Sequence, residues 1–482
     1  MKLTYGISDK PQAGHLLVFA LQQMLAILAA TIAVPMIIGN GMTPAAAMFG
    51  AGVGTITYLL FTKFKSPVFL GSSFAFLGSM SAAFAGGVSM QLGMLGLIVG
   101  AALAGMVYVL LALIVKSVGV GWLNRLMPPV VIGPTVAIIG LSLAKNAIGD
   151  LQRGDVMLNA DTPAASPFAA MLCGLITLFV VMACSVFGKK TLRLIPFIIG
   201  ILVGYGCAAI LTAIGISANI PSIQIIDFSV FRQYLMPDGT VTLRSFLRVP
   251  DLIFPEAFKG IGQMNGTYFL EILAAYVPVA FVVFSEHIAD HKNLSTIIGR
   301  DLLVNPGLTR TLLGDGIGSM LGAFFGGCPN TTYGESIACV AITGNASTVT
   351  IFAAAIGCIL LSFITPLVAF VDSIPSCVMG GVCIALYGFI AVSGLKMLKQ
   401  VDLDQNRNLF VASVILIAGI GGLSLNFGPV TITEVASALI LGILTNLILH
   451  TGKESPEEPF ETAEPFKAAP AKRPQTKKKK HK

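Results

Sequence analysis

Charged side chains are scarce in this sequence. Asp, Glu, Lys and Arg make up 11% of the 482 residues, whereas 55% of the residues are hydrophobic. An ordinary soluble domain carries roughly 25% charged residues. A soluble fold could not cover this much apolar surface with polar groups, so the composition excludes an ordinary soluble enzyme or binding module.

The sequence also lacks the strict polar and apolar alternation of strands, which argues against a membrane barrel. Apolar runs recur instead from Gln12 to His450, and about fourteen of them have the roughly 20 residues that a helix needs to cross a bilayer. Helices suit such runs because lipid offers no hydrogen bonds to free backbone groups. We therefore expect an all-α membrane protein with about fourteen transmembrane helices.

Several processing and binding signals are missing as well. The first apolar run, about Leu16 to Ile38, has full span length, so we expect an anchor rather than a cleavable signal peptide. The eight cysteines have neither metal-site spacing nor a disulfide pattern. Basic residues gather in a tail of Pro, Glu, Ala and Lys after His450, without the interleaved aromatics of a nucleic-acid surface. No nucleic-acid partner is expected.

Lys and Arg in the short loops fall on one side when fourteen spans are drawn, which predicts that side to be cytoplasmic. Residues 1–14 and the basic tail 451–482, expected to be disordered, would join them there, so the transporter domain is residues 15–450. The segment from Asp227 to Lys259 carries Arg232, Arg244 and Arg248 on the opposite side. The rule is weak for so long a segment.

Two short stretches point to an internal repeat. Met127-Pro-Pro-Val-Val-Ile-Gly133 resembles Ile374-Pro-Ser-Cys-Val-Met-Gly380, and each opens an apolar span. Seven spans lie between the two copies, so the copies would run in opposite directions. This spacing predicts two inverted repeats of seven spans, as in transporters in which one bundle rocks against another.

Each half also contains an interrupted span. Val68–Phe76 places Gly and two Ser in apolar sequence, and Gly326–Glu335 contains Pro329, consecutive threonines and Gly334. Neither segment favours a continuous helix. Unwound backbone survives at membrane depth only where protein or a watery cavity satisfies it, so both segments are candidates for a binding site.

Ionisable residues at membrane depth are functional candidates. Three places have them: Ser285–His291, Glu335 and Asp315. On a helix Glu286 and Asp290 share one face, and His287 and His291 share a neighbouring face. The alternatives are a Glu286 at the cytoplasmic interface and a Glu335 that only ties down backbone N–H groups.

Carboxylates accept hydrogen bonds from ring N–H groups, and backbone N–H groups donate to ring carbonyls. A planar solute with alternating N–H and C=O groups, such as a nucleobase, suits a pocket of this kind. A carboxyl group shielded from water could also take up a proton on one side of the membrane and release it on the other, which would couple transport to protons.

At these residues the chain resembles the nucleobase/cation symporter-2 family, also called nucleobase–ascorbate transporters, and most closely its bacterial uracil permeases. The resemblance runs from about Gln12 to His450 and is carried by four ordered motifs: Gly71-Ser-Ser-Phe-Ala-Phe76, Glu286-His-Ile-Ala-Asp-His291, Asn305-Pro-Gly-Leu308 and Pro329-Asn-Thr-Thr-Tyr-Gly-Glu335.

The resemblance implies a proton-coupled symporter that imports uracil by alternating access, with the proton as coupling ion and no cofactor. It implies a core domain of spans 1–4 and 8–11, a gate domain of spans 5–7 and 12–14, and short strands in spans 3 and 10. A multi-pass protein of the plasma membrane, dimeric through the gate domains, is expected.

The resemblance also implies roles for individual residues. Glu286 and Glu335 would bind the ring, and the backbone N–H groups of Phe74 and Gly334 would meet its carbonyls. His291 would couple protons by partnering Glu286, with Asp290 beside it. The other expected pocket residues are Ala30, Tyr333, Tyr387 and Gln23.

Two departures from the uracil permeases leave alternatives open. Gln23 stands where those permeases have a histidine, and Asp290 stands at a position that is often glycine. Xanthine or another base is therefore an alternative substrate. A membrane metalloenzyme that uses His287 and His291 is a distant one, because their i, i+4 spacing suits zinc but no third ligand is evident. Transport of inorganic or carboxylate anions would require a cation in the pocket.

Overall fold

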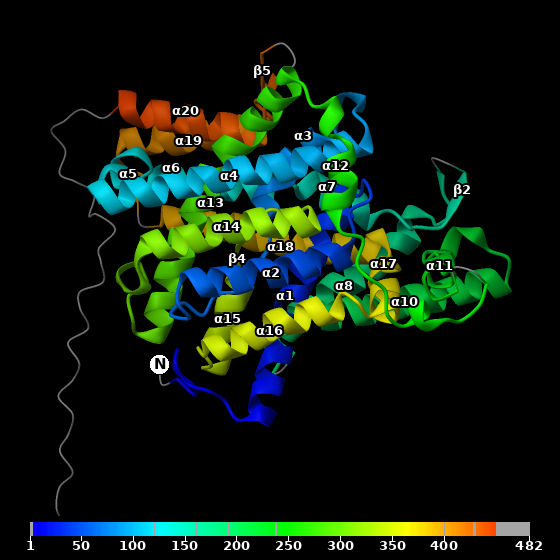
Figure 1. Ribbon diagram of the computed structural model, residues 1–482. Helices are drawn as coiled ribbons and strands as arrows, with labels where there is room; N and C mark the ends of the chain where they lie inside the picture. The colour runs from blue at the N-terminus through cyan, green and yellow to red at the C-terminus, as the bar shows by residue number, and fades with distance from the viewer. Residues whose placement is uncertain are drawn as a thin grey trace, which may run out of the picture.

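The computed structural model describes residues 3–119, 121–159, 162–189, 192–193, 195–236, 239–399, 401–427 and 430–449. Long helices in this part of the chain run side by side and form one bundle (Figure 1). The basic tail from residue 451 onward, expected to be disordered, lies outside the described residues.

Eight helical stretches among the described residues are long and apolar enough to cross a membrane. They are α1 (Ala13–Ile38), α2 (Pro44–Phe61), α4 (Met90–Val118), α6 with α7 (Pro129–Ser142 and Ala144–Leu151), α8 (Pro167–Phe187), α10 (Pro196–Ser217), α13 (Gly266–Ile298) and α18 (Ser376–Leu398).

The remaining helices are shorter or less apolar. They are α3 (Leu77–Ala83), α5 (Gly121–Leu126), α11 (Ser229–Leu235), α12 (Ile253–Lys259), α14 (Leu308–Gly326), α15 (Gly334–Thr343), α16 (Thr348–Leu361), α17 (Thr365–Asp372), α19 (Asn406–Ile420) and α20 (Glu434–Ile448). The described structure is thus a helical membrane protein with eight full-length candidate spans.

Polar caps and prolines fix where several spans begin. Thr43 accepts a hydrogen bond from the backbone N–H of Ala46 at 3.2 Å and precedes Pro44, the first residue of α2. Asn265 accepts one from Tyr268 at 2.8 Å at the start of α13. A side-chain acceptor satisfies an N–H group that the helix leaves free, and proline at the first position has no N–H to satisfy.

The two segments expected to be interrupted each contain a short strand. Strand β1 (Leu70–Ser72) pairs antiparallel with β4 (Asn330–Thr332), with Gly71 opposite Thr331. Two further short pairs join β2 (Met157–Asn159) to β3 (Thr162–Pro163) and β5 (Leu425–Phe427) to β6 (Val430–Ile432). Pairing β1 with β4 brings two segments together that are about 260 residues apart in sequence.

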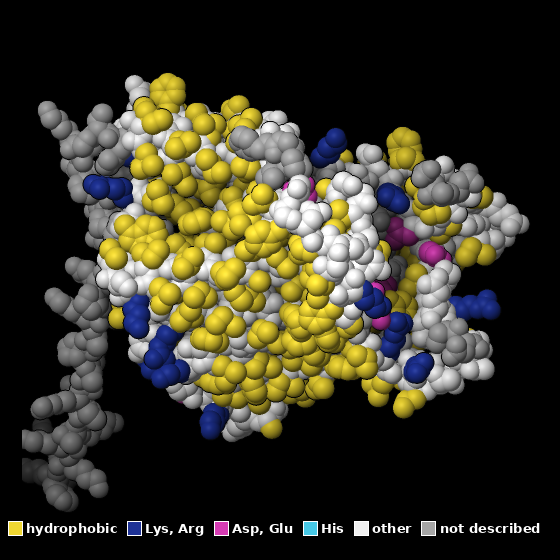
Figure 2. Space-filling view, turned by 45° about the horizontal axis from the view of Figure 1, so that its top comes forward, with side chains coloured by type: hydrophobic (Ala, Val, Ile, Leu, Met, Phe, Trp, Pro, Cys, Tyr) yellow, Lys and Arg dark blue, Asp and Glu magenta, His cyan; other side chains and the backbone are white. Residues whose placement is uncertain are grey.

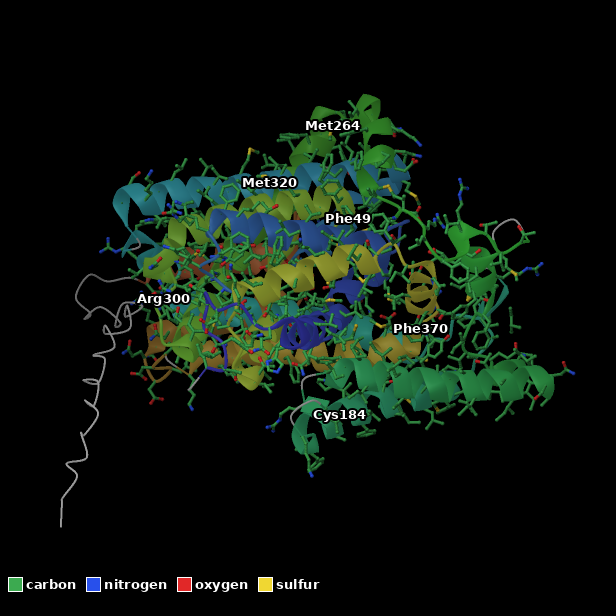
Figure 3. The ribbon with its side chains drawn as sticks, turned by 60° about the horizontal axis from the view of Figure 1, so that its bottom comes forward. Phe49, Cys184, Met264, Arg300, Met320 and Phe370 are labelled. Atoms are coloured by element: carbon green, nitrogen blue, oxygen red, sulfur yellow. The ribbon has the colours of Figure 1, made fainter. Side chains whose placement is uncertain are left out.

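Small residues let three helix pairs approach closely. A Cβ on Gly50 of α2 would lie 2.4 Å from the carbonyl oxygen of Gly322 on α14, and Met320 of the same helix covers Gly105 of α4 (Figure 3). A Cβ on Gly140 of α6 would lie 2.2 Å from the carbonyl oxygen of Tyr387 on α18. Close backbone contact of this kind is typical of helix packing in membranes.

Apolar side chains cover much of the outer surface of the bundle, and Lys and Arg side chains gather toward its ends (Figure 2). Phe168 and Phe187, at the two ends of α8, are 79% and 83% exposed. Soluble monomers rarely expose apolar patches of this extent. The bundle therefore presents a surface suited to lipid.

Candidate functional site

Two cavities meet around the predicted carboxylates. The larger has a volume of about 420 Å³ and the smaller about 50 Å³. Both are lined by Val136, Glu286, Gly334, Glu335, Leu386 and Ile390. Because they share these side chains, we treat the smaller cavity as the inner part of one site and the larger as its entrance.

The broken segments supply backbone donors to the inner cavity. A short 3₁₀ helix, Phe74–Phe76, follows β1, and α15 follows β4, beginning at Gly334. Phe74 and Gly334 both line the smaller cavity. The first N–H groups of a helix have no partner within it and carry a partial positive charge, so the cavity lies at two donor-bearing helix starts.

Tyr333 fixes one strand against the other. Its hydroxyl donates to the carbonyl oxygen of Ser72 at 2.9 Å, and its ring covers Gly71, where a Cβ would lie 2.4 Å from the ring carbons. Its ring also lines the smaller cavity. Glycine is required at position 71 because any side chain there would displace this ring.

Three carboxylates line the larger cavity. Glu286 and Asp290 lie one turn apart on α13, and Glu335 lies in the first turn of α15. Asp290 Oδ2 accepts a hydrogen bond from Thr332 Oγ1 of β4 at 2.6 Å. These residues do not sit at a water-exposed helix end, because α13 continues to Ile298 and Glu286 and Glu335 also line the inner cavity.

The two histidines lie on a neighbouring face of α13, as helical geometry predicts, but His291 does not partner Glu286. His291 Nε2 meets the hydroxyl of Tyr58 at 2.6 Å, and its Nδ1 meets the carbonyl oxygen of His287 at 2.7 Å. Both ring nitrogens are therefore occupied. The predicted pairing of His291 with Glu286 is wrong for this conformation, and Asp290 is the neighbour that faces the cavity.

Three other predicted pocket residues lie beside the cavities without lining them. Gln23 Nε2 donates to Ser336 Oγ near the start of α15. Tyr387 is buried with its ring centroid 5.7 Å from that of Phe74, and Ala30 is buried on α1. Tyr387 thus packs against a lining residue of the smaller cavity, whereas Ala26, one turn before Ala30, lines the larger cavity.

Most of the cavity wall consists of residues that the sequence did not single out. Val136 of α6 and Leu386 and Ile390 of α18 face the carboxylates across the site. Arg193 lines the larger cavity and donates from Nε to the carbonyl oxygen of Ser185 at 2.9 Å. No Lys or Arg is among the described residues that line the smaller cavity.

Neither histidine is arranged as a metal ligand. His287 Nδ1 lies 2.7 Å from Asp315 Oδ2, and its Nε2 lies 3.0 Å from Thr311 Oγ1. Across the described parts of the chain, no group of three or more His, Cys, Asp or Glu residues could hold a metal ion. The metalloenzyme alternative therefore has no support in this geometry.

Comparison with solved structures places the fold among membrane transporters. The transmembrane domain of the cyanobacterial bicarbonate transporter BicA aligns with a TM-score of 0.59 at 13% identity, covering 92% of this chain and 99% of that one. The murine anion transporter Slc26a9 in its inward-facing state aligns with a TM-score of 0.60 at 12% identity, covering 92% and 69%. Identities this low concern the fold alone.

Sequence comparison gives a closer relationship. The chain is 38% identical to a uracil permease of Bacillus subtilis, covering 94% of this chain and 97% of the relative. It is 39% identical to one of Bacillus caldolyticus, covering 94% and 96%, and 36% identical to one of Escherichia coli K12, covering 92% and 93%. The model of the Permease family matches residues 14–427. The chain is thus a transporter rather than an enzyme, and it belongs to this permease family, the nucleobase/cation symporter-2 family to which its four motifs pointed.

Proposed function

We propose that this protein is a uracil permease that imports the base together with protons by alternating access. The observation that carries the proposal is the inner cavity, where Glu286 and Glu335 face two helix starts, at Phe74 and Gly334. Relatives that are 36–39% identical over more than nine tenths of this chain are uracil permeases.

The chemistry of the inner cavity matches a neutral ring better than an anion. Uracil alternates N–H donors with carbonyl acceptors; carboxylates would accept from its N–H groups, and the N–H groups of Phe74 and Gly334 would donate to its carbonyls. The two solved structures that share the fold are a bicarbonate transporter and an anion transporter. Two carboxylates would repel such a solute, because like charges at short distance disfavour each other.

Proton coupling is proposed for the carboxylates that face the cavity. Glu286 can exchange a proton when the cavity opens to water and can bind the ring when the cavity closes. Asp290, held by Thr332, lies one turn away on the same face. We assign the coupling role to Glu286 and Asp290, because the ring nitrogens of His291 have other partners.

The close contacts support an inverted repeat of fourteen spans. If the chain is counted as fourteen, α2 and α14 are spans 2 and 9, β1 and β4 belong to spans 3 and 10, and α6 and α18 are spans 5 and 12. Gly50 and Gly54 of α2 meet Gly322 and Gly318 of α14, so this pair runs antiparallel. The β1–β4 pair is antiparallel as well. A two-fold axis in the membrane plane would produce this relation between equivalent spans.

In the same count, the larger cavity lies between a core domain and a gate domain. Glu286, Gly334 and Glu335 would belong to the core (spans 1–4 and 8–11), and Val136, Leu386 and Ile390 to the gate (spans 5–7 and 12–14). We propose that the two domains rock against each other, and that the protein forms a homodimer through its gate domains. We also propose that it resides in the plasma membrane with both termini in the cytoplasm.

The decisive experiment is uptake of labelled uracil into proteoliposomes, with and without a proton gradient. We expect accumulation driven by the gradient, with xanthine a poor competitor. Glu286→Gln should abolish accumulation, because the amide can neither carry the proton nor accept equivalently from the ring. Glu271→Gln is the matched control, since Glu271 lies about four turns earlier on α13 and lines neither cavity. Normal accumulation by Glu286→Gln would exclude this residue from the mechanism.

A further inference from the structure

The described residues between 227 and 251 form a lobe at the end of the bundle away from the N-terminal residues, beside α10 and α17 (Figure 1). This 227–251 lobe contains α11 and a 3₁₀ turn, Leu243–Ser245. It is tied to α17 and the turn before it. Thr365 Oγ1 donates to the carbonyl oxygen of Arg244 at 2.9 Å, and the N–H of Arg248 donates to that of Phe363 at 3.0 Å.

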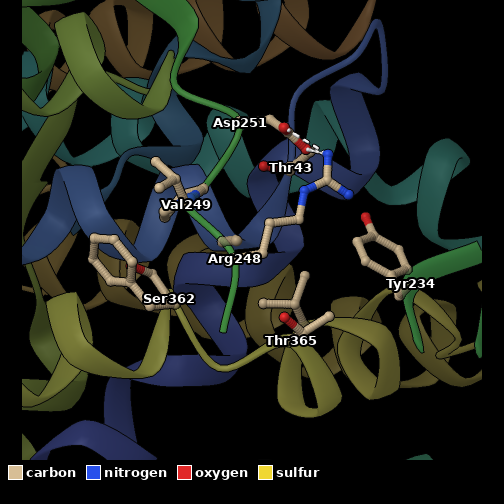
Figure 4. Close-up of a pocket in the computed structure, with 11 residues that line it drawn as sticks. Thr43, Tyr234, Arg248, Val249, Asp251, Ser362 and Thr365 are labelled. Carbon is tan, nitrogen blue, oxygen red and sulfur yellow. Dashed lines mark hydrogen bonds and ion pairs between the residues drawn. The ribbon is translucent and has the colours of Figure 1, made fainter. Parts of the chain in front are cut away.

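The side chain of Arg248 makes contacts within the lobe. Its Nη2 lies 2.9 Å from Asp251 Oδ1, and its guanidinium carbon lies 5.7 Å from the ring centroid of Tyr234 (Figure 4). The cavity around it, which Thr43 and Thr365 also line, has a volume of about 10 Å³. That space holds about one water molecule, so we assign no ligand to it.

Much of the surface of the lobe is apolar. Large hydrophobic side chains stand exposed along it, with Leu243 76% and Phe246 58% exposed. The others are Phe228, Met236, Val241, Leu247 and Val249. Seven such residues within this short segment form an apolar surface that a loop standing in water would not present.

A groove of about 330 Å³ runs across this surface. Its apolar walls are Phe231, Leu235, Met236, Val241, Phe246 and Pro366. Arg232 and Ser245 also line it, almost entirely through their carbon atoms. The volume reaches the lower end of the range for small-molecule pockets, roughly 300 to 1,000 Å³. The apolar lining suits a hydrocarbon chain, and the side chain of Arg232 is exposed beside it.

The charges of the lobe favour a negatively charged group. Arg232 and Arg244 are exposed, and neither is in an ion pair among the described residues. Among the described acidic residues of the lobe, Asp227 accepts from Ser229 N and Oγ at 2.9 Å, and Asp251 pairs with Arg248. An anion at Arg232 would therefore meet a guanidinium that no described carboxylate pairs with.

The lobe is continuous with the lipid-facing surface of the bundle. Phe168 at the start of α8 and Ile214 and Ile216 near the end of α10 are exposed apolar side chains at the same end of the molecule. In Figure 2, hydrophobic side chains at this end lie among both basic and acidic ones. We propose that the groove binds a phospholipid of the surrounding leaflet, with an acyl chain along its apolar walls and the phosphate at Arg232.

The sequence offers a direct probe, because Trp122 is its only tryptophan. In a Trp122→Phe background, Phe246→Trp places a fluorophore in the groove and Phe168→Trp places one on the lipid-facing surface of α8. Both are reconstituted with lipids brominated on their acyl chains. We expect bromine to quench both fluorophores.

The headgroup is tested with brominated phosphatidylglycerol against brominated phosphatidylcholine. One basic residue near a membrane is worth roughly a fivefold preference for anionic lipid. We expect the tryptophan at position 246 to show that preference, Arg232→Gln to remove it, and Arg244→Gln, which lies outside the groove lining, to retain it.

Three results would overturn the proposal. Quenching at position 168 but not at 246, with 246 open to acrylamide, would place the lobe in water. Protection of 246 from both bromine and acrylamide would mean that a second copy of the chain covers the groove. If the Arg232→Gln and Arg244→Gln variants show the same preference for anionic lipid, Arg232 does not bind the phosphate.

Discussion

Glu286 and His287 are neighbours in sequence that face different surroundings. Glu286 lines both cavities, whereas His287 is fully buried and hydrogen-bonded to Asp315 and Thr311 of α14. The rings of His287 and His291 stack with centroids 4.0 Å apart, and His291 is hydrogen-bonded to Tyr58 of α2. This buried network sets the rotation of α13 and therefore which face it presents to the site.

The network gives a prediction about stability. Asp315→Ala leaves His287 Nδ1 without its partner in a buried setting, and an unsatisfied buried polar group costs about 1–3 kcal/mol. We expect a lower midpoint of unfolding for the detergent-purified protein. Asp315→Asn keeps an acceptor for His287 and is the control. Equal midpoints for the Ala and Asn variants would show that the pair does not hold α13.

Single residues also show which positions the sequence indicated and which it did not. Glu286, Asp290, Glu335, Phe74 and Gly334 line the cavities. The carboxylates could be singled out because charge at membrane depth is visible in the sequence, and the family resemblance indicated Phe74 and Gly334. The hydrogen-bond partner of His291 could not be predicted from the sequence, because that partner is Tyr58, more than 200 residues away. Which neighbour a side chain meets depends on how helices pack, and periodicity gives only its direction.

At the scale of elements, the strand pair β1–β4 decides the shape of the inner cavity. Each strand is three residues long and leads into a helix start that carries free N–H groups. The Tyr333 ring over Gly71 keeps the two strands in register. The geometry of the donors therefore depends on one glycine.

Gly71→Ala tests this dependence. Its Cβ would lie 2.4 Å from the ring of Tyr333, and overpacking of this kind costs about 1–3 kcal/mol. We expect weaker uracil binding, measured by calorimetry on the purified protein, together with a lower unfolding midpoint. Gly78→Ala is the control, because a Cβ there meets nothing closer than 3.7 Å. If both variants bind uracil as tightly as the parent protein, the contact between Tyr333 and Gly71 does not determine uracil binding.

Full-length apolar helices were predictable because length and composition define them. The number of spans does not follow from length alone. Eight stretches of the described chain are long and apolar enough to cross a membrane, and other apolar helices have 10 to 17 residues. α14 is long enough but carries Arg310 and Asp315 among its glycines. Helices α2 and α4 pack against the glycines of α14. The hydropathy of α14 alone does not indicate this close packing.

At the scale of the whole molecule, the larger cavity joins the inner site to one end of the bundle. Its walls come from α13 and α15 on one side and from α6, α10 and α18 on the other. No local pattern predicted Val136, Leu386 or Ile390, because they are ordinary apolar residues of ordinary apolar helices. They become site residues only when distant spans assemble.

Alternating access predicts that this cavity changes its exposure during transport. Ala338 lines the larger cavity and is exposed, so Ala338→Cys in a cysteine-free background should react with a water-soluble maleimide. We expect uracil to change the labelling rate. Ala369→Cys, at a fully buried position outside the cavities, is the control and should label poorly. If the Ala338→Cys variant binds uracil but is labelled at the same rate with and without uracil, closure of the cavity around the substrate is contradicted.

The central claim is that a carboxylate in mid-membrane carries a proton together with a neutral base. The direct measurement is the luminal pH of proteoliposomes loaded with a pH-sensitive dye, after uracil is added outside without an imposed gradient. We predict acidification of the lumen that requires uracil and is absent in Glu286→Gln. Uracil entry without acidification, or undiminished acidification in the Glu286→Gln variant, would contradict the account.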